Sequence, residues 1–300
     1  MKVFISTTTF AQYDELPLQL LMEKGIEYQI NPLHKKLTKE ELLSFAANVE
    51  GLIAGTESLS YDVLKELKNL KVISRCGTGL DNVDLKSADK LGIKVFNTPD
   101  APTDAVAELT LGLMLDCLRF ISKADRNIRS GAWVKPMGNL LKDKIVGIIG
   151  YGRIGKAVAK LVQSFGAKII VFDIAKNSDG KLFVSFDQLL KSSDIITLHI
   201  PAIDKKILID DNAISNMKQG SFLINTSRGG LVDEDALYNA LKTGKLAGAG
   251  IDTFNQEPYK GKLVEIENVV LTSHIGSYAK ESRIEMEKQA VKNLLKGLGV

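Results

Sequence analysis

The sequence lacks the features that mark several classes of protein. Its 300 residues include two cysteines, Cys76 and Cys117, too few for a disulfide framework or a metal cluster of their own. No run approaches the ~18 consecutive apolar residues that a membrane-spanning helix needs, and the start, MKVFIST, has no signal-peptide pattern. We therefore expect a cytoplasmic protein with reduced thiols and no membrane partner.

Neither sign of charge is in large excess. The sequence has 39 Lys and Arg residues and 36 Asp and Glu residues, which gives a net charge of +3, and the two signs are interleaved along the chain. A nucleic-acid partner would require clustered positive charge, so none is expected. The apolar share of 45% is ordinary for a globular protein, and the length allows two domains.

Short β-branched runs alternate with segments of helical periodicity almost from end to end. The first series of predicted strands is Lys2–Ser6, Glu27–Ile30, Leu52–Ala54, Val72–Ser74 and Ile93–Phe96. The second is Ile145–Ile149, Lys168–Phe172, Asp194–Leu198, Phe222–Asn225, Ala249–Ile251 and Val269–Leu271. Nearly continuous apolar strands indicate parallel sheets covered by helices on both faces. We predict an α/β protein with two doubly wound units.

Two helical segments help to divide the chain. Thr38–Val49 is predicted as a helix whose N-terminus is closed by a capping box of Thr38 and Glu41. A longer helical pattern runs from Pro102 to about Phe120. Because Pro99 disfavours helix just before it, the first unit is expected to end near Asn97-Thr98-Pro99, although composition alone allows any boundary in 97–142.

A glycine-rich turn follows the strand that ends at Ile149. The turn reads Gly150-Tyr151-Gly152-Arg153-Ile154-Gly155, and a helical pattern follows at once. In such a turn the first glycine allows the tight bend, the second lets the backbone approach a pyrophosphate, and the third lets helix and strand pack closely. The helix N-terminus offers N–H groups to the phosphates. The motif alone is weak, but within strand–turn–helix–strand it indicates a dinucleotide site.

The next strand ends in Asp173, roughly the 20 residues beyond the motif at which the fingerprint places its acidic residue. Its carboxylate would accept hydrogen bonds from the adenosine ribose and would repel a 2′-phosphate. We therefore predict NAD rather than NADP as the cofactor. The residues predicted from the motif to bind it are Gly150, Gly152, Arg153, Ile154, Gly155 and Asp173.

Oxidation of a hydroxy acid needs a group that takes the hydroxyl proton, and histidine suits this role because it titrates near neutrality. Of the three histidines, His34 lies in a polar stretch and is expected to be a solvated loop residue. His199 ends a strand just before Pro201, where packing is as good an interpretation as catalysis. His274 follows the strand Val269–Leu271, at the kind of carboxyl end where open α/β sheets bind ligands.

Arg228 and Glu257 also follow predicted strands. Arg228 is a cation for a substrate carboxylate, and the two glycines after it would let a substrate approach the backbone. A carboxylate such as Glu257 beside His274 would fix the imidazole tautomer and favour its protonated form. Position alone leaves both roles open, since Arg and Glu on loops are usually solvated.

The order and spacing of these motifs resemble those of the D-isomer-specific 2-hydroxyacid dehydrogenases, and the likeness covers essentially the whole chain. The motifs that carry it are Gly150–Gly155, Asp173, Asn225-Thr-Ser-Arg228-Gly-Gly, Asp252-Thr-Phe-Asn-Gln-Glu257-Pro and Thr272-Ser-His274-Ile-Gly-Ser. The resemblance implies an NAD-dependent enzyme that transfers a hydride between a D-2-hydroxy acid, its small-molecule substrate, and the corresponding 2-oxo acid.

The resemblance also implies roles for single residues. Arg228 would bind the substrate carboxylate and carbonyl, His274 would be the acid/base, and Glu257 would pair with that histidine. Asp252 would contact the nicotinamide end of the cofactor. The other predicted cofactor contacts are His199 and Thr226.

The domain arrangement follows from the same resemblance. A Rossmann NAD-binding domain, residues 100–275, would be inserted in a discontinuous, flavodoxin-like substrate domain formed by residues 1–99 and 276–300. The cofactor domain would supply the main contact of a homodimer through the long helix from Pro102.

The substrate is suggested by the stretch Arg75–Asp84, in which the backbone N–H groups of Gly77, Thr78 and Gly79 would cradle a carboxylate. Together with Asn97-Thr-Pro99 and Ala107-Glu-Leu-Thr110, this stretch is most similar to 3-phosphoglycerate dehydrogenases. The predicted substrate pair is therefore 3-phosphoglycerate and 3-phosphohydroxypyruvate, with Arg75 and Lys135 on the phosphate. Alternatively, Arg75 pairs with a local carboxylate such as Asp81 or Asp84.

Two departures weaken the phosphoglycerate interpretation. Glu57 stands where phosphoglycerate enzymes often carry a basic residue, and the sequence stops at Val300, without the C-terminal regulatory domain of many of them. A glyoxylate or hydroxypyruvate reductase, or another D-2-hydroxyacid dehydrogenase, is the alternative. Glu257 argues against formate dehydrogenases, which usually carry glutamine there. A more distant alternative is an NAD(H)-sensing corepressor on the same fold, although the long flanking extensions of such regulators are missing.

Overall fold

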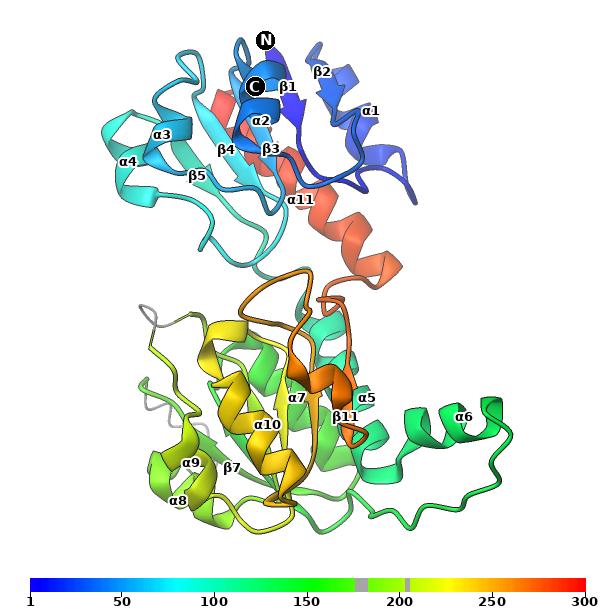
Figure 1. Ribbon diagram of the computed structural model, residues 1–300. Coiled ribbons are helices and arrows are strands. Elements are labelled where there is room, and N and C mark those ends of the chain that lie inside the picture. Colours follow the sequence, from blue (N-terminus) through cyan, green and yellow to red (C-terminus); the bar gives the residue numbers. More distant parts are fainter. Residues whose placement is uncertain (176–182, 203–205) are drawn as a thin grey trace. The chain divides into compact units, whose positions relative to one another are not determined.

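The computed structural model describes residues 1–175, 183–202 and 206–300 (Figure 1). The chain divides into two compact units, a first unit of Met1–Pro102 with Ser277–Val300 and a second unit of Thr103–Gly276. Each unit contains one sheet, and every strand pairing within both sheets is parallel. The predicted α/β class with two doubly wound units is confirmed.

The first unit has a five-stranded sheet in the order β2-β1-β3-β4-β5, the flavodoxin-like order. Its strands are β1 (Lys2–Ile5), β2 (Glu27–Ile30), β3 (Gly51–Ala54), β4 (Val72–Arg75) and β5 (Lys94–Phe96). Its helices are α1 (Leu16–Glu23), α2 (Lys39–Ala46), α3 (Tyr61–Leu64), α4 (Leu85–Lys90) and α11 (Lys280–Leu298). Buried side chains of α2, α3 and α4 cover one face of the sheet, and those of α1 and α11 cover the other.

Helix α2 shows how local signals set an element. Thr38 accepts a hydrogen bond from the Glu41 N–H, and Glu41 accepts one from the Thr38 N–H, so the predicted capping box is present. The helix ends at Ala46, before the predicted Val49. Val49 is buried and its N–H donates to the Ala46 carbonyl, so it extends the apolar pattern from within a turn.

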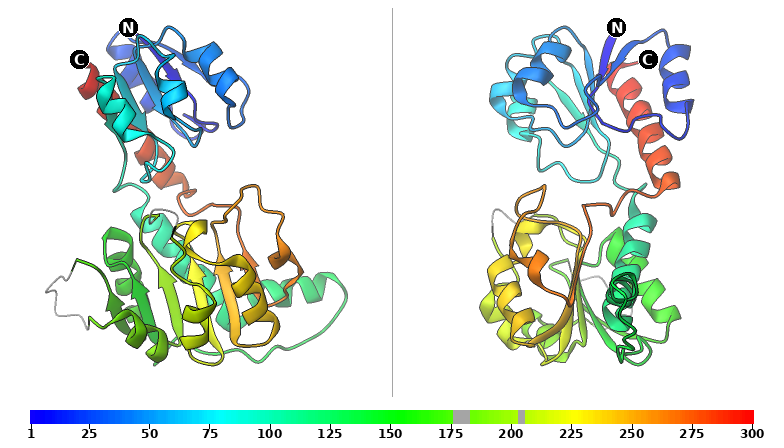
Figure 2. Two further views of the ribbon diagram at one scale, coloured as in Figure 1. Left: turned by 60° about the vertical axis from the view of Figure 1, so that its left-hand side comes forward. Right: turned by 45° about the vertical axis from the view of Figure 1, so that its right-hand side comes forward.

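The second unit has a six-stranded sheet in the order β11-β10-β9-β8-β6-β7. Its strands are β6 (Ile145–Ile149), β7 (Lys168–Phe172), β8 (Ile195–Leu198), β9 (Ser221–Asn225), β10 (Leu246–Ile251) and β11 (Val269–Leu271). Its helices are α5 (Thr103–Arg119), α6 (Ile121–Arg129), α7 (Arg153–Ser164), α8 (Phe186–Ser192), α9 (Asp211–Asn216) and α10 (Glu234–Lys242), with short 3-10 turns at Gly229–Leu231 and Lys262–Glu265. Helices α5 and α7 cover one face, and α8, α9 and α10 cover the other (Figure 2).

The strand order of the second sheet positions its functional loops. The order reverses between β6 and β8, and such a switch point is where doubly wound sheets bind ligands at the carboxyl ends of their strands. Gly150 follows β6 and His199 follows β8, so both lie there. On the other side, the adjacent strands β9, β10 and β11 precede Arg228, Glu257 and His274.

Helix α6 and the segment after it extend from the body of the second unit (Figure 1). Their large apolar side chains are exposed: Ile121, Ile128, Trp133, Val134, Met137 and Leu140. We call this segment, residues 121–140, the arm. The spacing of apolar residues in the sequence did not reveal that α6 is exposed. Apolar residues on an exposed helix follow the same spacing as those on a buried one.

Both cysteines, Cys76 and Cys117, are free and buried. Among the described residues, no helix combines the length and the apolar character that crossing a membrane demands.

Candidate active site

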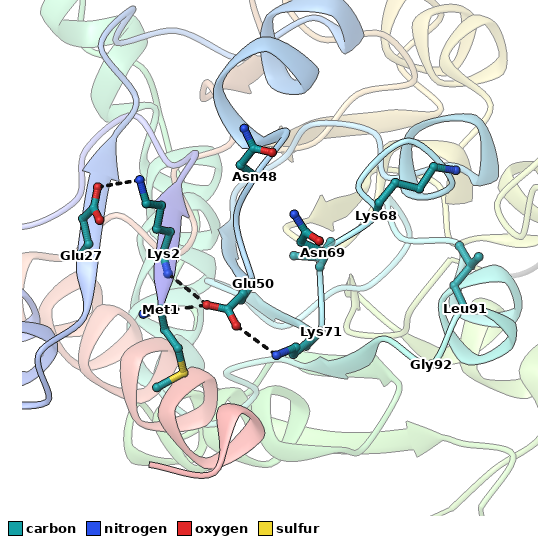
Figure 3. Close-up of a pocket in the computed structure, with 11 residues that line it drawn as sticks. Met1, Lys2, Glu27, Asn48, Glu50, Lys68, Asn69, Lys71, Leu91 and Gly92 are labelled. Atoms are coloured by element: carbon teal, nitrogen blue, oxygen red, sulfur yellow. Dashed lines mark hydrogen bonds and ion pairs between the residues drawn. The ribbon is translucent and has the colours of Figure 1, made fainter.

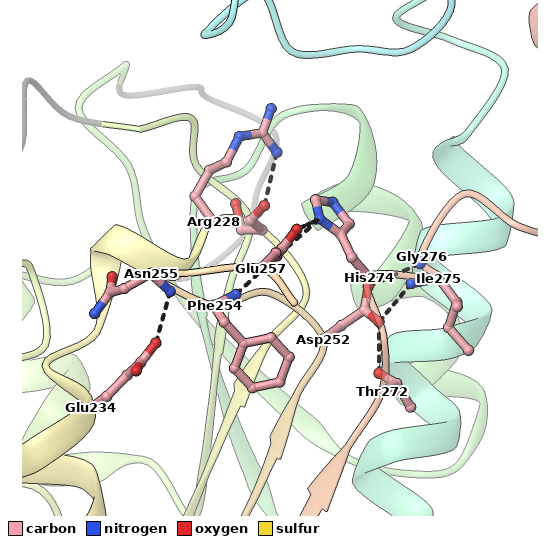
Figure 4. Close-up of polar contacts among 11 residues, drawn as sticks. Arg228, Glu234, Asp252, Phe254, Asn255, Glu257, Thr272, His274, Ile275 and Gly276 are labelled. Carbon is pink, nitrogen blue, oxygen red and sulfur yellow. Dashed lines mark hydrogen bonds and ion pairs between the residues drawn. The ribbon is translucent and has the colours of Figure 1, made fainter. Parts of the chain in front are cut away.

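His274 and Glu257 form a hydrogen-bonded pair above the second sheet (Figure 4). His274 Nδ1 lies 2.9 Å from Glu257 Oε2 and 3.1 Å from Oε1. The side chains are 46% and 38% exposed, respectively. With a carboxylate on Nδ1, that nitrogen carries the ring proton and Nε2 is left as the atom that exchanges a proton with a ligand. The predicted pairing of these residues is therefore seen in the geometry.

The backbone at His274 is in the left-handed region, with φ of 55°. Asp252, which is 1% exposed, holds this turn from below. Its carboxylate accepts hydrogen bonds from Thr272 Oγ1 (2.6 Å), the Ile275 N–H (2.8 Å) and the Gly276 N–H (2.9 Å). These donors flank His274 on both sides. Asp252 thus positions the histidine, and its predicted contact with nicotinamide stays a prediction.

Arg228 stands on the loop after β9, which is anchored by the buried Asn225. Asn225 Nδ2 donates to the Arg228 carbonyl at 2.8 Å, and Asn225 Oδ1 accepts from the Ser227 N–H at 3.0 Å. The guanidinium Nη1 donates to the Ser227 carbonyl at 2.8 Å. The three predicted catalytic residues, Arg228, Glu257 and His274, therefore follow three adjacent strands at one edge of the sheet.

The glycine-rich turn has the geometry of a dinucleotide site. Gly150 has a φ of 91°, and a Cβ there would lie 2.4 Å from the His199 carbonyl oxygen. A Cβ on Gly155 would lie 2.0 Å from the Gly150 carbonyl oxygen, so the third glycine lets α7 pack on the turn. Gly152 is the N-cap of the 12-residue α7 and faces open space. A pyrophosphate fits at this helix N-terminus.

Asp173 lies beside that turn, at the end of β7. Its Oδ2 accepts a hydrogen bond from the Tyr151 N–H at 2.5 Å, and its Oδ1 accepts one from the Ala175 N–H at 2.8 Å. The side chain is thereby oriented toward the glycine turn, while remaining half-buried. Its contact with a ribose stays a prediction.

His199 is not suited to proton transfer. Burial lowers the pKa of His199 from its ordinary value of 6.5 to about 3, so the ring is neutral at physiological pH. Its Nε2 lies 2.9 Å from Thr197 Oγ1. Thr226, also predicted at the cofactor, is buried with its Oγ1 2.8 Å from Thr110 Oγ1 of α5. His34 is exposed, as its polar context indicated.

The predicted carboxylate nest of the first unit is partly occupied by the protein itself. The Gly77 N–H donates to Thr98 Oγ1 at 2.8 Å. The Arg75 side chain lies across Gly77, where an added Cβ would be 1.1 Å from Nη1, and Nη1 donates to the Cys76 carbonyl at 2.7 Å. Asp84, one of the two carboxylates considered for Arg75, caps α4 by accepting from Ser87.

Two other residues considered for substrate selection have different surroundings. Glu57 is 3% exposed and folds back onto the first unit, where it accepts hydrogen bonds from the Ser6 hydroxyl and from the Gly55 N–H. Lys135 is exposed on the arm of the second unit. Sequence reasoning identified the unusual acid but not its burial, because Ser6 is distant in the chain.

A hollow of about 650 Å³ opens at the opposite, amino edge of the first sheet (Figure 3). Its charged side chains pair among themselves, Lys2 with Glu27 at 3.1 Å and Lys71 with Glu50 at 2.9 Å. Parallel sheets bind ligands at their carboxyl ends, so this hollow is a solvated charged surface and not the candidate active site.

The chain is similar in sequence to proteins of one family. The model of that family described as "D-isomer specific 2-hydroxyacid dehydrogenase, NAD binding domain" matches residues 111–276. The chain is 40% identical to a hydroxypyruvate reductase of Thermotoga maritima over 96% of each protein. It is 39% identical to a glyoxylate reductase of Thermococcus litoralis over 92% of this chain and 88% of that protein. A D-3-phosphoglycerate dehydrogenase of Archaeoglobus fulgidus is 34% identical over 95% of this chain and 56% of that protein.

Solved structures give the same likeness. A protein of Thermus thermophilus superposes with a TM-score of 0.92 at 35% identity, covering 100% of this chain and 97% of that one. A D-lactate dehydrogenase of Aquifex aeolicus, solved with NAD and lactic acid, superposes with a TM-score of 0.85 at 28% identity, covering 100% and 95%.

Proposed function

The chain belongs to the D-isomer-specific 2-hydroxyacid dehydrogenases, which are NAD-dependent oxidoreductases, and we propose that it reduces a small unphosphorylated 2-oxo acid, hydroxypyruvate or glyoxylate. The observation that carries this choice is the charge at the carboxyl edge of the first sheet, where the family resemblance places the substrate. Glu57 is buried there, and it makes no ion pair with a Lys or Arg among the residues that the structure describes.

Two cations of the first unit, Arg283 and Arg75, are already engaged. Arg283 Nη2 lies 3.0 Å from Glu287 Oε1, and Arg75 contacts the Cys76 carbonyl. A phosphate would add about two negative charges beside an uncompensated carboxylate. A substrate with a single carboxylate avoids that cost.

The geometry of the second unit supports a role for each catalytic residue. Arg228 binds the substrate carboxylate and carbonyl, and His274 Nε2 donates the proton that the carbonyl oxygen needs as it becomes a hydroxyl. Glu257 on Nδ1 stabilises the protonated imidazole before the transfer. Bound NADH supplies the hydride. In the reverse direction His274 takes the hydroxyl proton.

NAD is the cofactor that the residues present fit. The turn Gly150–Gly155 and the N-terminus of α7 would hold the pyrophosphate, and the negative charge of Asp173 would exclude a 2′-phosphate. Asp252 is buried, and its carboxylate accepts three hydrogen bonds from the loop that carries His274, so we propose that it supports His274 and stands outside the proton path.

The substrate proposal is tested by turnover with NADH on hydroxypyruvate, glyoxylate, pyruvate and 3-phosphohydroxypyruvate. We expect kcat/KM on hydroxypyruvate or glyoxylate to exceed that on 3-phosphohydroxypyruvate. The opposite order would establish the phosphoglycerate function, which the stretch Arg75–Asp84 favours. Turnover of none of them, with NADH still bound, would favour the corepressor alternative.

Arg75→Ala separates the two substrate interpretations further. If Arg75 holds a phosphate, KM for the phosphorylated substrate should rise by roughly tenfold or more while hydroxypyruvate kinetics barely change. Because Arg75 lies across Gly77, we expect similar losses on both substrates, as for a residue that holds the loop.

We also propose a homodimer through the second unit. The exposed apolar side chains of the arm support this proposal, in which the arm contributes to the contact together with the predicted contact of α5. Sedimentation of the wild type and of the double variant Trp133→Ala, Met137→Ala tests it: the variant should shift toward the mass of one chain. The cytoplasmic location likewise stays a proposal, supported by the two free cysteines.

A further inference from the structure

A residue that is not one of the three predicted catalytic residues holds the loop that carries Glu257. Glu234, the first residue of α10, accepts a hydrogen bond through Oε1 from the Asn255 N–H at 2.7 Å (Figure 4). The neighbouring N–H, that of Phe254, donates to Glu257 Oε1 at 3.1 Å. Two successive backbone amides of this loop are thus bound by two carboxylates, and one of these is the partner of His274.

The same loop also rests directly on the backbone that follows Arg228. A Cβ on Gly229 would lie 2.0 Å from the carbonyl carbon of Phe254 and 2.5 Å from the nitrogen of Asn255. Only a glycine permits this approach. The segment 228–234 therefore contacts the loop twice, through the backbone at its start and through the Glu234 side chain at its end.

The acidic residues beside Glu234 have other partners. Asp233 caps α10 by accepting from the N–H groups of Asp235 and Ala236, each at 3.0 Å. Asp235 is exposed and pairs with Lys262 at 3.0 Å. Stabilising the N-terminus of α10 accounts for an acid at any of these positions. It does not account for the direction of the Glu234 carboxylate, which reaches to the loop.

We propose that Glu234 is a positioning residue of the active site, which fixes the distance between Glu257 and His274 and ties that pair to the segment bearing Arg228. The inference rests on the proposed roles of these three residues. Its physical basis is geometric: the pair is partly exposed, so its alignment depends on how firmly the backbone beneath Glu257 is held. Without the Glu234 contact, the loop near Glu257 keeps the Phe254 amide, the approach at Gly229 and the stacking of Phe254 on Tyr259.

The experiment compares Glu234→Ala with Glu234→Gln and with the matched control Asp235→Ala, which removes an acid from the same helical turn. We expect Glu234→Ala to lower kcat on hydroxypyruvate or glyoxylate by about three- to tenfold, as for one lost hydrogen bond, with KM for NADH unchanged. Its pH–rate profile should move toward lower pH, in the direction of Glu257→Gln. Exchange of the Asn255 amide hydrogen should accelerate.

Glu234→Gln keeps an acceptor oxygen and should restore kcat and the pH profile, and Asp235→Ala should leave both at the wild-type values. A wild-type pH profile in Glu234→Ala, or a loss of kcat shared with Asp235→Ala, would overturn the positioning role. If Glu257→Gln itself leaves the profile unchanged, the proposed Glu257–His274 pairing fails. If that profile moves and the Glu234→Ala profile does not, the inference about Glu234 fails alone.

Discussion

The carboxyl edges of the two sheets carry similar polar side chains, but these side chains have different surroundings in the two units. In the second unit, Arg228, Glu257 and His274 stand partly exposed on loops, and a buried Asp252 supports the loop of His274. In the first unit, several polar groups of the edge are bonded to one another. Those bonds join Glu57 to Ser6 and Gly55, Gly77 to Thr98, and Arg283 to Glu287.

Burial explains why the two edges differ. At the first edge, burial raises the pKa of the Cys76 thiol to about 11, so this group does not exchange protons near neutral pH. In the second unit, burial lowers the pKa of His199 to about 3. His274, the proposed proton carrier, is by contrast partly exposed. Buried polar groups hold neighbouring segments in place, and several such groups lie at the carboxyl edge of the first sheet.

The largest effect should come from removing the proton carrier of the second edge. His274→Ala should lower kcat by on the order of 10²–10⁴, because proton transfer is lost while the cofactor site is untouched. Fluorescence titration should show unchanged NADH affinity. His34→Ala, at an exposed histidine of the first unit, is the matched control and should have wild-type kcat. Near-normal turnover of His274→Ala would move the acid/base elsewhere.

The partly buried His199 should affect how stability depends on pH. The pKa of His199 is about 3 in the folded chain, below its ordinary value of 6.5, so its contribution to stability is present above pH 6.5 and is lost as the pH falls toward 3. At pH 5 the loss should be about 2 kcal/mol. Urea unfolding at pH 7.5 and pH 5 should show that His199→Asn loses less stability than the wild type does. Equal losses would mean that His199 is not buried as a neutral ring.

The cofactor end of the second unit should respond to charge. Asp173→Ala should reduce the preference for NADH over NADPH, measured as the ratio of kcat/KM values, on the order of tenfold, because a like charge is removed from beside the 2′-phosphate. Asp173→Asn keeps an acceptor for the Tyr151 or Ala175 N–H and separates the loss of charge from the loss of those bonds. A wild-type enzyme that prefers NADPH would contradict the assignment of NAD.

The smallest effect is expected from replacing Glu257, the hydrogen-bond partner of His274. Glu257→Gln removes the carboxylate charge beside His274 Nδ1, so the pH–rate profile should move slightly toward lower pH, since the pair is partly exposed. The profile of kcat/KM between pH 5 and pH 9 measures it. An unmoved profile would show that the 2.9 Å contact has no energetic role in the free enzyme.

Local patterns predicted the elements that have clear boundaries in the sequence. The bounds of β6, β7 and β11 agree with the prediction, because Gly150, Asp173 and Thr272 end their apolar runs. Strand β10 begins at Leu246 instead of Ala249. It pairs there with β9 across an irregular register at Gly248, and a pairing between distant segments leaves no local signal.

The candidate site divides in the same way. The sequence was sufficient to predict the glycine turn, the acidic residue after it and the order of the motifs. These features depend on spacing within one strand–turn–helix unit or on family resemblance. The sequence was not sufficient to predict three contacts between distant residues. These are the support of the His274 loop by Asp252, the hydrogen bond from Asn255 to Glu234, and the hydrogen bond from the Gly77 amide to Thr98.

The sequence by itself determined the two parallel sheets, the dinucleotide turn and the candidate catalytic residues. Tertiary structure alone decided which polar groups are buried as supports and which stay exposed for chemistry. The physical reason is that burial and hydrogen bonding depend on strand order. β9, β10 and β11 lie side by side, and the segments that follow them bring Glu234, Asp252 and His274 against loops that are remote in sequence.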